Sequence, residues 1–162
     1  MQSGLLRVEE VPAPGIQNEH VLVQTAYSLI SAGTERSLVE TGRKNLIGKA
    51  LSRPDQVHKV LRSVKQLGIE ATFSLVKSRL AARMPLGYSA SGIVIGVGPG
   101  VEGLTVGDWV ACGGAAAGHA EVINIPRNLC VPVPEGVALR QAAFTTVGAI
   151  ALQGIRLADV RL

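Results

Sequence analysis

Hydrophobic and polar residues alternate over two short stretches near the start of the chain. The first spans residues 5–11 and ends at Pro12 and Pro14, and the second spans residues 21–27 and is rich in β-branched side chains. Alternation of this kind places apolar side chains on one face of an extended segment, and β-branched residues favour that conformation. Both stretches are therefore predicted to be β-strands.

A different spacing follows between residues 37 and 84, where apolar residues recur every three or four positions. Residues 54–68 show it best, because several aliphatic side chains fall on one face of a helix and Gly68 stands where a C-terminal cap is expected. A shorter helix is expected near residues 43–51, and the spacing continues to Met84. Residues 37–84 are therefore predicted to form a helical insertion.

Short apolar runs separated by glycines return after residue 85. Residues 93–95, 109–111 and 119–125 are predicted strands, and close strands joined by glycine turns are typical of a small β-barrel. Residues 139–156 are rich in alanine and are predicted to be a helix, although two internal glycines lower the helical propensity. The expected fold class is mainly β with a helical insertion, of the α+β type.

The composition narrows the class of protein. The chain has 162 residues, enough for one domain with a buried core, and 47% of them are hydrophobic against 17% charged, which argues against intrinsic disorder. Two cysteines are too few for a disulfide framework and no secretory signal pattern is visible, so a cytoplasmic location is expected. The uncharged stretch 84–101 is interrupted by Pro99 and several glycines, which argues against a membrane helix.

The net charge of +4 is unevenly distributed along the chain. Residues 36–83 carry eleven basic and three acidic residues, whereas the remainder carries five basic and nine acidic ones. A basic segment can bind an acidic partner or simply form a solvated helical face. Phe73 is the only aromatic residue in the segment, so stacking on nucleic-acid bases is not favoured.

A longer set of motifs carries a family resemblance. The glycine-rich run from Gly87 to Val110, together with residues 6–14, 119–122 and 132–136, resembles the medium-chain dehydrogenase/reductase superfamily, of the alcohol dehydrogenase kind. The resemblance implies a GroES-like β-barrel that supplies the substrate side of an oxidoreductase active site. It also implies NAD or NADP as the cofactor, bound by a separate Rossmann domain.

Four shorter segments narrow the resemblance. Residues 31–37, 46–50, 53–57 and 84–88 resemble bacterial bi-domain oxidoreductases, in which a medium-chain dehydrogenase is fused to a sugar-type Gfo/Idh/MocA oxidoreductase. That resemblance implies a small-molecule substrate related to sugars or polysaccharide biosynthesis. A homo-oligomer is compatible with it.

The sequence stops at residue 162, before the Gly-x-Gly-x-x-Gly turn with which the Rossmann domain of such a family binds a pyrophosphate. The glycines at 96, 98 and 100 are no substitute, because Pro99 lacks a backbone donor and the residues that follow predict a strand instead of a helix. These glycines are interpreted as a turn. The chain is therefore expected to be a fragment without its Rossmann domain, and to be inactive when isolated.

The resemblance also bears on zinc. It places Ser31, the Tyr88-Ser89 pair and Thr146 or Val147 at the positions where zinc-dependent members carry their Cys and His-Glu ligands. Hydroxyl groups are poor zinc ligands beside thiolate and imidazole. A zinc-independent reaction is therefore expected, with no metal site.

Tyr88 is the leading candidate for catalysis, since a phenol can donate a proton to an oxygen that gains charge during hydride transfer. The alternative, a barrel tyrosine whose hydroxyl group is satisfied by the protein, stays open. Ser31, Thr34 and Glu35 are expected in a glycine-containing turn after a strand, where functional groups are common. Ser31 is a second catalytic candidate and Glu35 a candidate proton relay, although the turn could also bond its own backbone.

Other polar residues are assigned simpler roles. The candidates for ligand contact are Thr34, Ser89 and His119 for the substrate and Thr146 for the cofactor. Cys112 is expected to be a small buried thiol, because no positive neighbour that would make it reactive is evident. Asp108 is expected to fix a turn. The alternative to an oxidoreductase domain is a stand-alone binding or assembly module that docks an acidic partner through the basic insertion.

Overall fold

The computed structural model describes residues 6–43, 68 and 85–159. The chain divides into two compact units. One combines Glu10–Ser31 with Pro85–Leu162, and the other combines Met1–Glu9 with Ala32–Met84. Most of the predicted insertion 37–84 lies outside the described residues. Of the helices predicted near 43–51 and over 54–68, only Arg43 and Gly68 are described.

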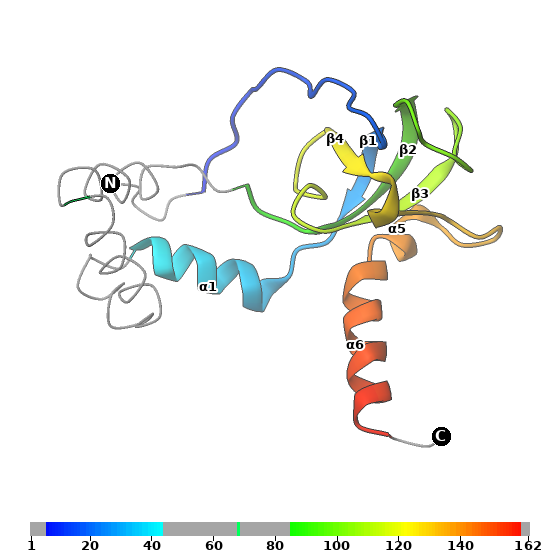
Figure 1. Ribbon diagram of the computed structural model, residues 1–162. Helices are drawn as coiled ribbons and strands as arrows, with labels where there is room; N and C mark the ends of the chain where they lie inside the picture. Colours follow the sequence, from blue (N-terminus) through cyan, green and yellow to red (C-terminus); the bar gives the residue numbers. More distant parts are fainter. Residues whose placement is uncertain (1–5, 44–67, 69–84, 160–162) are drawn as a thin grey trace. The chain divides into compact units, whose positions relative to one another are not determined.

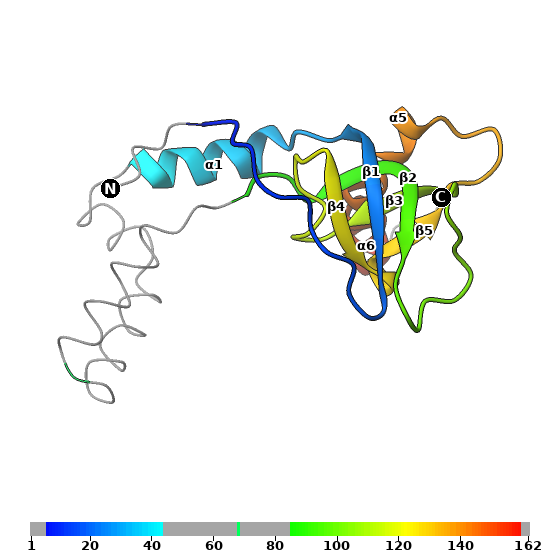
Figure 2. The same ribbon diagram turned by 90° about the horizontal axis from the view of Figure 1, so that it is seen from above.

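The first of these units is built on one antiparallel sheet (Figures 1 and 2). Its strands in the described residues run in the order β4-β1-β2-β3-β5. Their bounds are His20–Ser28 for β1, Ser89–Val97 for β2, Trp109–Gly113 for β3, Val122–Pro126 for β4 and Cys130–Pro132 for β5. The mainly β fold class is confirmed.

The core of this unit follows from the alternation of residues along the strands. Val21 and Val23 of β1 are fully buried, as are Ile125 of β4 and Val94 of β2. Alternate residues of a strand point to the same face, so Val21 and Val23 of β1 enter the core together, as do Ile123 and Ile125 of β4. Burying an aliphatic side chain of this size contributes about 1.5–3 kcal/mol each, which makes this face the main source of stability.

In the described residues the helices are α1 (Ala32–Arg43), the short 3₁₀ helix η1 (Arg127–Leu129), α5 (Leu139–Ala142) and α6 (Thr145–Leu157). They belong to both units, since α1 lies in the unit with Ala32–Met84 and the others in the unit with the sheet. The hydroxyl groups of Ser89 and Ser91 fasten the α5 region to β2, since they donate to the carbonyl oxygens of Ala143 and Leu139 at 2.6 Å each. In the described part of the chain, no helix is long and apolar enough to cross a bilayer.

Several local predictions are confirmed and several are wrong. The strand predicted over 21–27 corresponds to β1, and the turn predicted at Asp108 exists, because its carboxylate accepts the backbone N–H of Thr105 at 2.7 Å. The strand predicted over 5–11 is wrong for its described residues, which are exposed and pair with no described strand. An extended apolar segment becomes a strand only where a neighbouring edge accepts its hydrogen bonds.

Three boundaries also differ from the sequence-based expectation. The glycine-containing turn expected after residue 31 is instead the first turn of α1, which begins at Ala32, and Glu35 there suits the positive end of the helix dipole. The strand expected over 119–125 begins only at Val122. The helix expected over 139–156 is broken into α5 and α6, and its two glycines lie inside α6 without interrupting it.

Candidate functional site

Tyr88 and Ser31 meet at the end of the β1–β2 ladder. The two strands are antiparallel, with Ser28 opposite Ala90, and the backbone N–H of Leu29 donates to the Ser89 carbonyl oxygen at 2.9 Å. This pairing carries the chain on to Ser31 on one side and back to Tyr88 on the other. The phenol of Tyr88 donates a hydrogen bond to Ser31 Oγ at 3.0 Å, and both side chains are half-buried.

The backbone of Tyr88 is held from a second direction. Its carbonyl oxygen accepts a hydrogen bond from the backbone N–H of Gly114 at 3.0 Å and a weaker one from Thr146 Oγ1 at 3.5 Å. Thr146 lies in the first turn of α6 and Gly114 directly follows β3. The end of β3 and the start of α6 therefore anchor Tyr88, and its phenol stays partly open to solvent.

His119 packs against the residue that precedes Tyr88. Gly87 has a φ of +91°, and a Cβ atom there would lie 2.9 Å from Cε1 of the His119 ring and 3.0 Å from its backbone nitrogen. The ring nitrogen Nδ1 of His119 lies 2.9 Å from Ser28 Oγ. Glycine at this position thus lets the exposed imidazole approach the backbone beside Tyr88 and join a second hydroxyl group at the end of β1.

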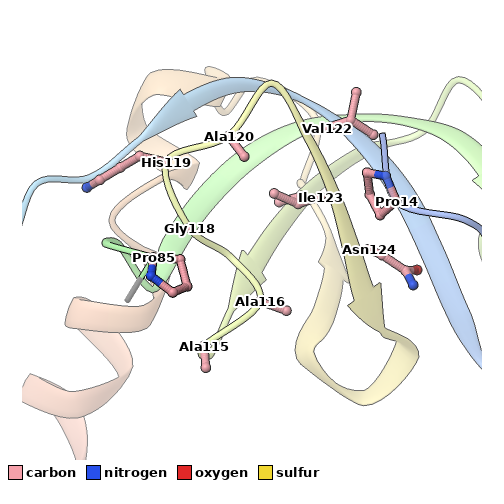
Figure 3. A pocket seen from close by; sticks show the side chains of 10 residues that line it. All are labelled: Pro14, Pro85, Ala115, Ala116, Gly118, His119, Ala120, Val122, Ile123 and Asn124. Carbon is pink, nitrogen blue, oxygen red and sulfur yellow. The ribbon is translucent and has the colours of Figure 1, made fainter. Parts of the chain in front are cut away.

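A shallow groove of about 300 Å³ begins at His119 (Figure 3). Its walls are mostly small and apolar, and His119 and Asn124 stand toward opposite ends of it. Asn124 Nδ2 donates to the Gly15 carbonyl oxygen at 3.1 Å, whereas its buried Oδ1 has no hydrogen-bond partner among the described residues. The lining residues are Pro14, Pro85, Ala115, Ala116, Gly118, His119, Ala120, Val122, Ile123 and Asn124.

The structure brings only some of the predicted site residues together. Ser31, Tyr88, His119 and Thr146 all lie in the unit that contains the sheet. Ser89 lies there too, but it is 1% exposed and its hydroxyl group is used by the Ala143 carbonyl oxygen, so it is not available to a ligand in this arrangement. Ser28 and Asn124 were missed by the sequence reasoning, and the only signal for them was a polar residue within or at the end of a predicted strand.

Thr34 and Glu35 belong to α1 and hence to the other unit. Thr34 is exposed, and Glu35 is 9% exposed although its carboxylate lies in the first turn of the helix. Both side chains have an interaction of their own. Their predicted roles in substrate contact and proton relay stay predictions.

The donors around Tyr88 do not suit zinc. Among the described residues, its side-chain hydrogen-bond partners are the hydroxyl groups of Ser31 and Thr146, which compete poorly with thiolate and imidazole for this metal. In the described ranges of the chain, no three His, Cys, Asp or Glu side chains are grouped so that they could hold a metal ion.

The glycine turn that follows β2 does not suit a dinucleotide pyrophosphate either. A Cβ atom on Gly98 would lie 2.0 Å from the Gln17 carbonyl oxygen, and the Gly98 N–H already donates to the His20 carbonyl oxygen at 2.9 Å. The chain's own backbone therefore fills the space that a phosphate group would need. The interpretation of this segment as a turn is confirmed at Pro99 and Gly100, whereas Gly96 lies inside β2 and pairs with Leu22 of β1.

Two comparisons of the sequence with known proteins found a match. Residues 57–135 match the family described as the alcohol dehydrogenase GroES-like domain. Over 58 residues, or 36% of the chain, the sequence is 43% identical to the partially reducing polyketide synthase men1 of Menisporopsis theobromae, of which the match covers 2%.

Two solved structures share the fold at low sequence identity. Galactitol-1-phosphate dehydrogenase from Escherichia coli matches with a TM-score of 0.66 and 19% identity, over 97% of this chain and 43% of that one. Escherichia coli quinone oxidoreductase complexed with NADPH matches with a TM-score of 0.52 and 21% identity, over 91% of this chain and 35% of that one. The chain thus spans less than half the length of these proteins.

Proposed function

The chain contains an alcohol dehydrogenase GroES-like domain of the medium-chain dehydrogenase/reductase fold, and on this premise we propose that it supplies the substrate side of an NAD(P)-dependent oxidoreductase. The observation that carries the proposal is the 3.0 Å hydrogen bond from the Tyr88 phenol to Ser31 Oγ. In this proposal the cofactor is bound by a Rossmann domain, the reaction needs no zinc, and the protein acts in the cytoplasm.

The hydroxyl groups of Tyr88 and Ser31 are hydrogen-bonded to each other. A substrate oxygen can therefore replace Ser31 as the acceptor of the hydrogen bond from Tyr88. A nicotinamide cofactor, when bound, supplies or accepts the hydride. During reduction the substrate carbonyl oxygen gains negative charge, and Tyr88 donates its hydrogen bond to that oxygen in place of Ser31. Until the substrate oxygen binds, Ser31 Oγ accepts this hydrogen bond and so holds the phenol in position. Tyr88 completes the reaction by transferring its proton, and in the oxidation of an alcohol it takes that proton back.

Thr146 keeps its predicted role as a cofactor contact. Its hydrogen bond to the Tyr88 carbonyl oxygen is 3.5 Å long, near the limit for such a bond. The hydroxyl group can therefore turn to a ligand at little cost, while the Gly114 N–H continues to hold Tyr88 in place.

The exposed apolar side chains of α6 are the reason to propose a partner domain in the same protein. Ile150 and Leu157 are 61% and 78% exposed, and no residue of α6 is buried. Large apolar side chains exposed along one helix are typical of an interface. We assign the Rossmann domain to this helix.

The substrate class follows from the groove and the hydroxyl pair. The walls of the groove are apolar and His119 stands at one end, which suits a small organic molecule with one polar group. A sugar-related carbonyl or alcohol is the proposed substrate, and quinones are the alternative, since the structural neighbours include proteins named for a sugar-alcohol phosphate and for quinones.

The proposal is tested by removing each hydroxyl group from the full-length protein. Tyr88→Phe is expected to lower kcat by about 100-fold to 1,000-fold for quinone or sugar carbonyl reduction by NADPH, because the donor to the developing oxyanion is lost. Ser31→Ala is expected to lower it less. Tyr27→Phe is the matched control, because Tyr27 is the chain's other tyrosine and is exposed on β1. Equal activity of the Tyr88→Phe and Tyr27→Phe variants would overturn the assignment.

Cofactor and metal are tested separately. Titration with NADPH and NADH, followed by nicotinamide fluorescence, is expected to show binding in a protein that includes the Rossmann domain and none in the 162-residue chain. Dialysis against a zinc chelator is expected to leave activity unchanged. If no form of the protein binds either nucleotide, the chain is a binding module, and salt-sensitive binding of polyanions would then identify its basic segment as the functional surface.

A further inference from the structure

The chain's two cysteines face each other inside the sheet. Cys112 of β3 and Cys130 of β5 are directly opposite in the antiparallel register, and their sulfur atoms lie 3.8 Å apart. Both side chains are buried, and they are 18 residues apart in the sequence. Among the described residues, no hydrogen bond joins either cysteine side chain to the hydroxyl groups of Tyr88 and Ser31.

The backbone hydrogen bonds between β3 and β5 show whether Cys112 and Cys130 form a hydrogen-bonded or a non-hydrogen-bonded pair. The backbone N–H of Val133 donates to the Trp109 carbonyl oxygen at 2.8 Å, so Trp109 and Val133 form a hydrogen-bonded pair. Hydrogen-bonded and non-hydrogen-bonded pairs alternate along an antiparallel ladder. Cys112 and Cys130, three positions along it, are therefore a non-hydrogen-bonded pair, in which the side chains lie closest.

That geometry suits a disulfide. The Cα atoms of a non-hydrogen-bonded pair are about 4.5 Å apart, within the range of about 4.4–6.8 Å that disulfides span. Only the sulfur atoms have to move, from the observed 3.8 Å to about 2 Å, by rotation about the Cα–Cβ bonds. The strands can keep their register while the bond forms.

The surroundings make Cys130 the nucleophile of the pair. A hydrogen bond from the Cys112 thiol lowers the pKa of Cys130 and the Arg127 guanidinium lowers it further, while burial opposes both. The same sulfur contact and burial raise the pKa of Cys112. Arg127 is held in place because it donates to the carbonyl oxygens of Cys130 and Glu102 at 2.8 Å each. A thiolate, not a thiol, attacks an oxidant.

We propose that Cys112 and Cys130 form a reversible disulfide across β3 and β5 when the protein meets hydrogen peroxide. The Cys130 thiolate attacks one peroxide oxygen, the O–O bond breaks, and the hydroxide that leaves becomes water on taking up a proton. The sulfur of Cys112 then attacks the resulting Cys130 sulfenic acid, forms the S–S bond and releases a second water molecule, whose additional proton comes from the Cys112 thiol. The two sulfur atoms lose two electrons and the peroxide gains two.

The oxidant reaches the pair through the edge of the sheet. β5 is three residues long, lies at the end of the strand order and follows η1 directly, so Cys130 is at the first position of a short edge strand. Such strands open locally at low cost in free energy. The disulfide would tie β5 to β3, whose end continues into Gly114, the donor to the Tyr88 carbonyl oxygen.

Mass spectrometry of the full-length protein tests the proposal without any substitution. Trypsin cleaves after Arg83, Arg127 and Arg140, so the two cysteines fall in separate peptides, residues 84–127 and 128–140. After brief peroxide treatment of the native protein, maleimide quenching and digestion, we expect the two peptides linked, with a mass about 2 Da below their sum because two hydrogen atoms are lost. Dithiothreitol should release both.

The same oxidation in denaturant is the control. In the folded protein we expect linkage at least about tenfold faster, because the fold holds the sulfur atoms in contact and lowers the pKa of Cys130. Cys112→Ser should leave a Cys130 sulfenic acid that dimedone traps, whereas Cys130→Ser should leave Cys112 unmodified. Unlinked peptides from the native protein, or linkage no faster than in denaturant, would overturn the proposal.

Discussion

The sheet and helix α6 are both rich in aliphatic residues, yet they use them in opposite ways. Val21, Val23 and Ile125 of the sheet are fully buried, whereas α6 has no buried residue. Figure 1 shows α6 extending from the sheet beyond α5, and in its first turn Thr146 is hydrogen-bonded to the Tyr88 carbonyl oxygen beside β2. The difference shows that an apolar composition alone does not bury a segment. Burial depends on whether the fold places another element against it.

The largest expected effect is on the backbone contact at the end of β2. Gly98→Ala would place a methyl group against the Gln17 carbonyl oxygen, which the backbone cannot easily move away. The free energy of unfolding should fall by about 3 kcal/mol or more, measured by urea denaturation. Gly148→Ala in α6 is the matched control, because no atom lies within 4 Å of the added group, and it should stabilise by about 0.5–1 kcal/mol. Similar results for both variants would contradict the comparison.

A core truncation should come next in size. Ile125→Ala removes most of a fully buried side chain from β4, and the lost burial and the cavity together should cost about 2–5 kcal/mol. Ile95→Ala in β2 is the control, since that side chain is 43% exposed and its loss should cost much less. Thermal denaturation of both variants checks the difference. Equal shifts in Tm would show that the face bearing Ile95 is covered as well.

The attachment of α5 to the sheet should show a smaller effect. Ser91→Ala removes the hydroxyl group that donates to the Leu139 carbonyl oxygen at 2.6 Å and leaves that buried oxygen without this bond. The loss should be about 0.5–1.5 kcal/mol, because the Leu139 carbonyl oxygen still accepts the backbone N–H of Ala143 at 3.0 Å. Hydrogen exchange should become faster in α5 and leave β1 unchanged. Unchanged exchange in α5 would show that Ser91 does not fasten this helix.

The smallest effect is expected on α6 itself. Ile150→Gln in the 162-residue chain should change the free energy of unfolding by less than about 0.5 kcal/mol, because the side chain is 61% exposed. In a protein that includes the proposed Rossmann domain, the same substitution should destabilise by more than about 1 kcal/mol through loss of buried area. No difference between the two forms would argue against α6 as the contact with that domain.

Much of the fold was predictable from local patterns. The alternation over 21–27 predicted β1, and Asp108 after Gly107 predicted the turn that the structure shows. β5 could not be predicted, because three residues ending in Pro132 carry too little pattern. The strand expected over 5–11 failed for a related reason, since the pattern shows that a segment is amphipathic but not whether a partner strand lies beside it.

The sequence named candidate residues for the site, but it could not give their arrangement. The sequence alone determined which residues alternate and where the glycines that break the strands lie. Only the tertiary structure decided that Tyr88 bonds Ser31 across 57 residues, that Ser89 is buried against Ala143, and that Cys112 faces Cys130. These contacts depend on strand register, which the pairing of the whole sheet determines and which no local stretch of sequence contains.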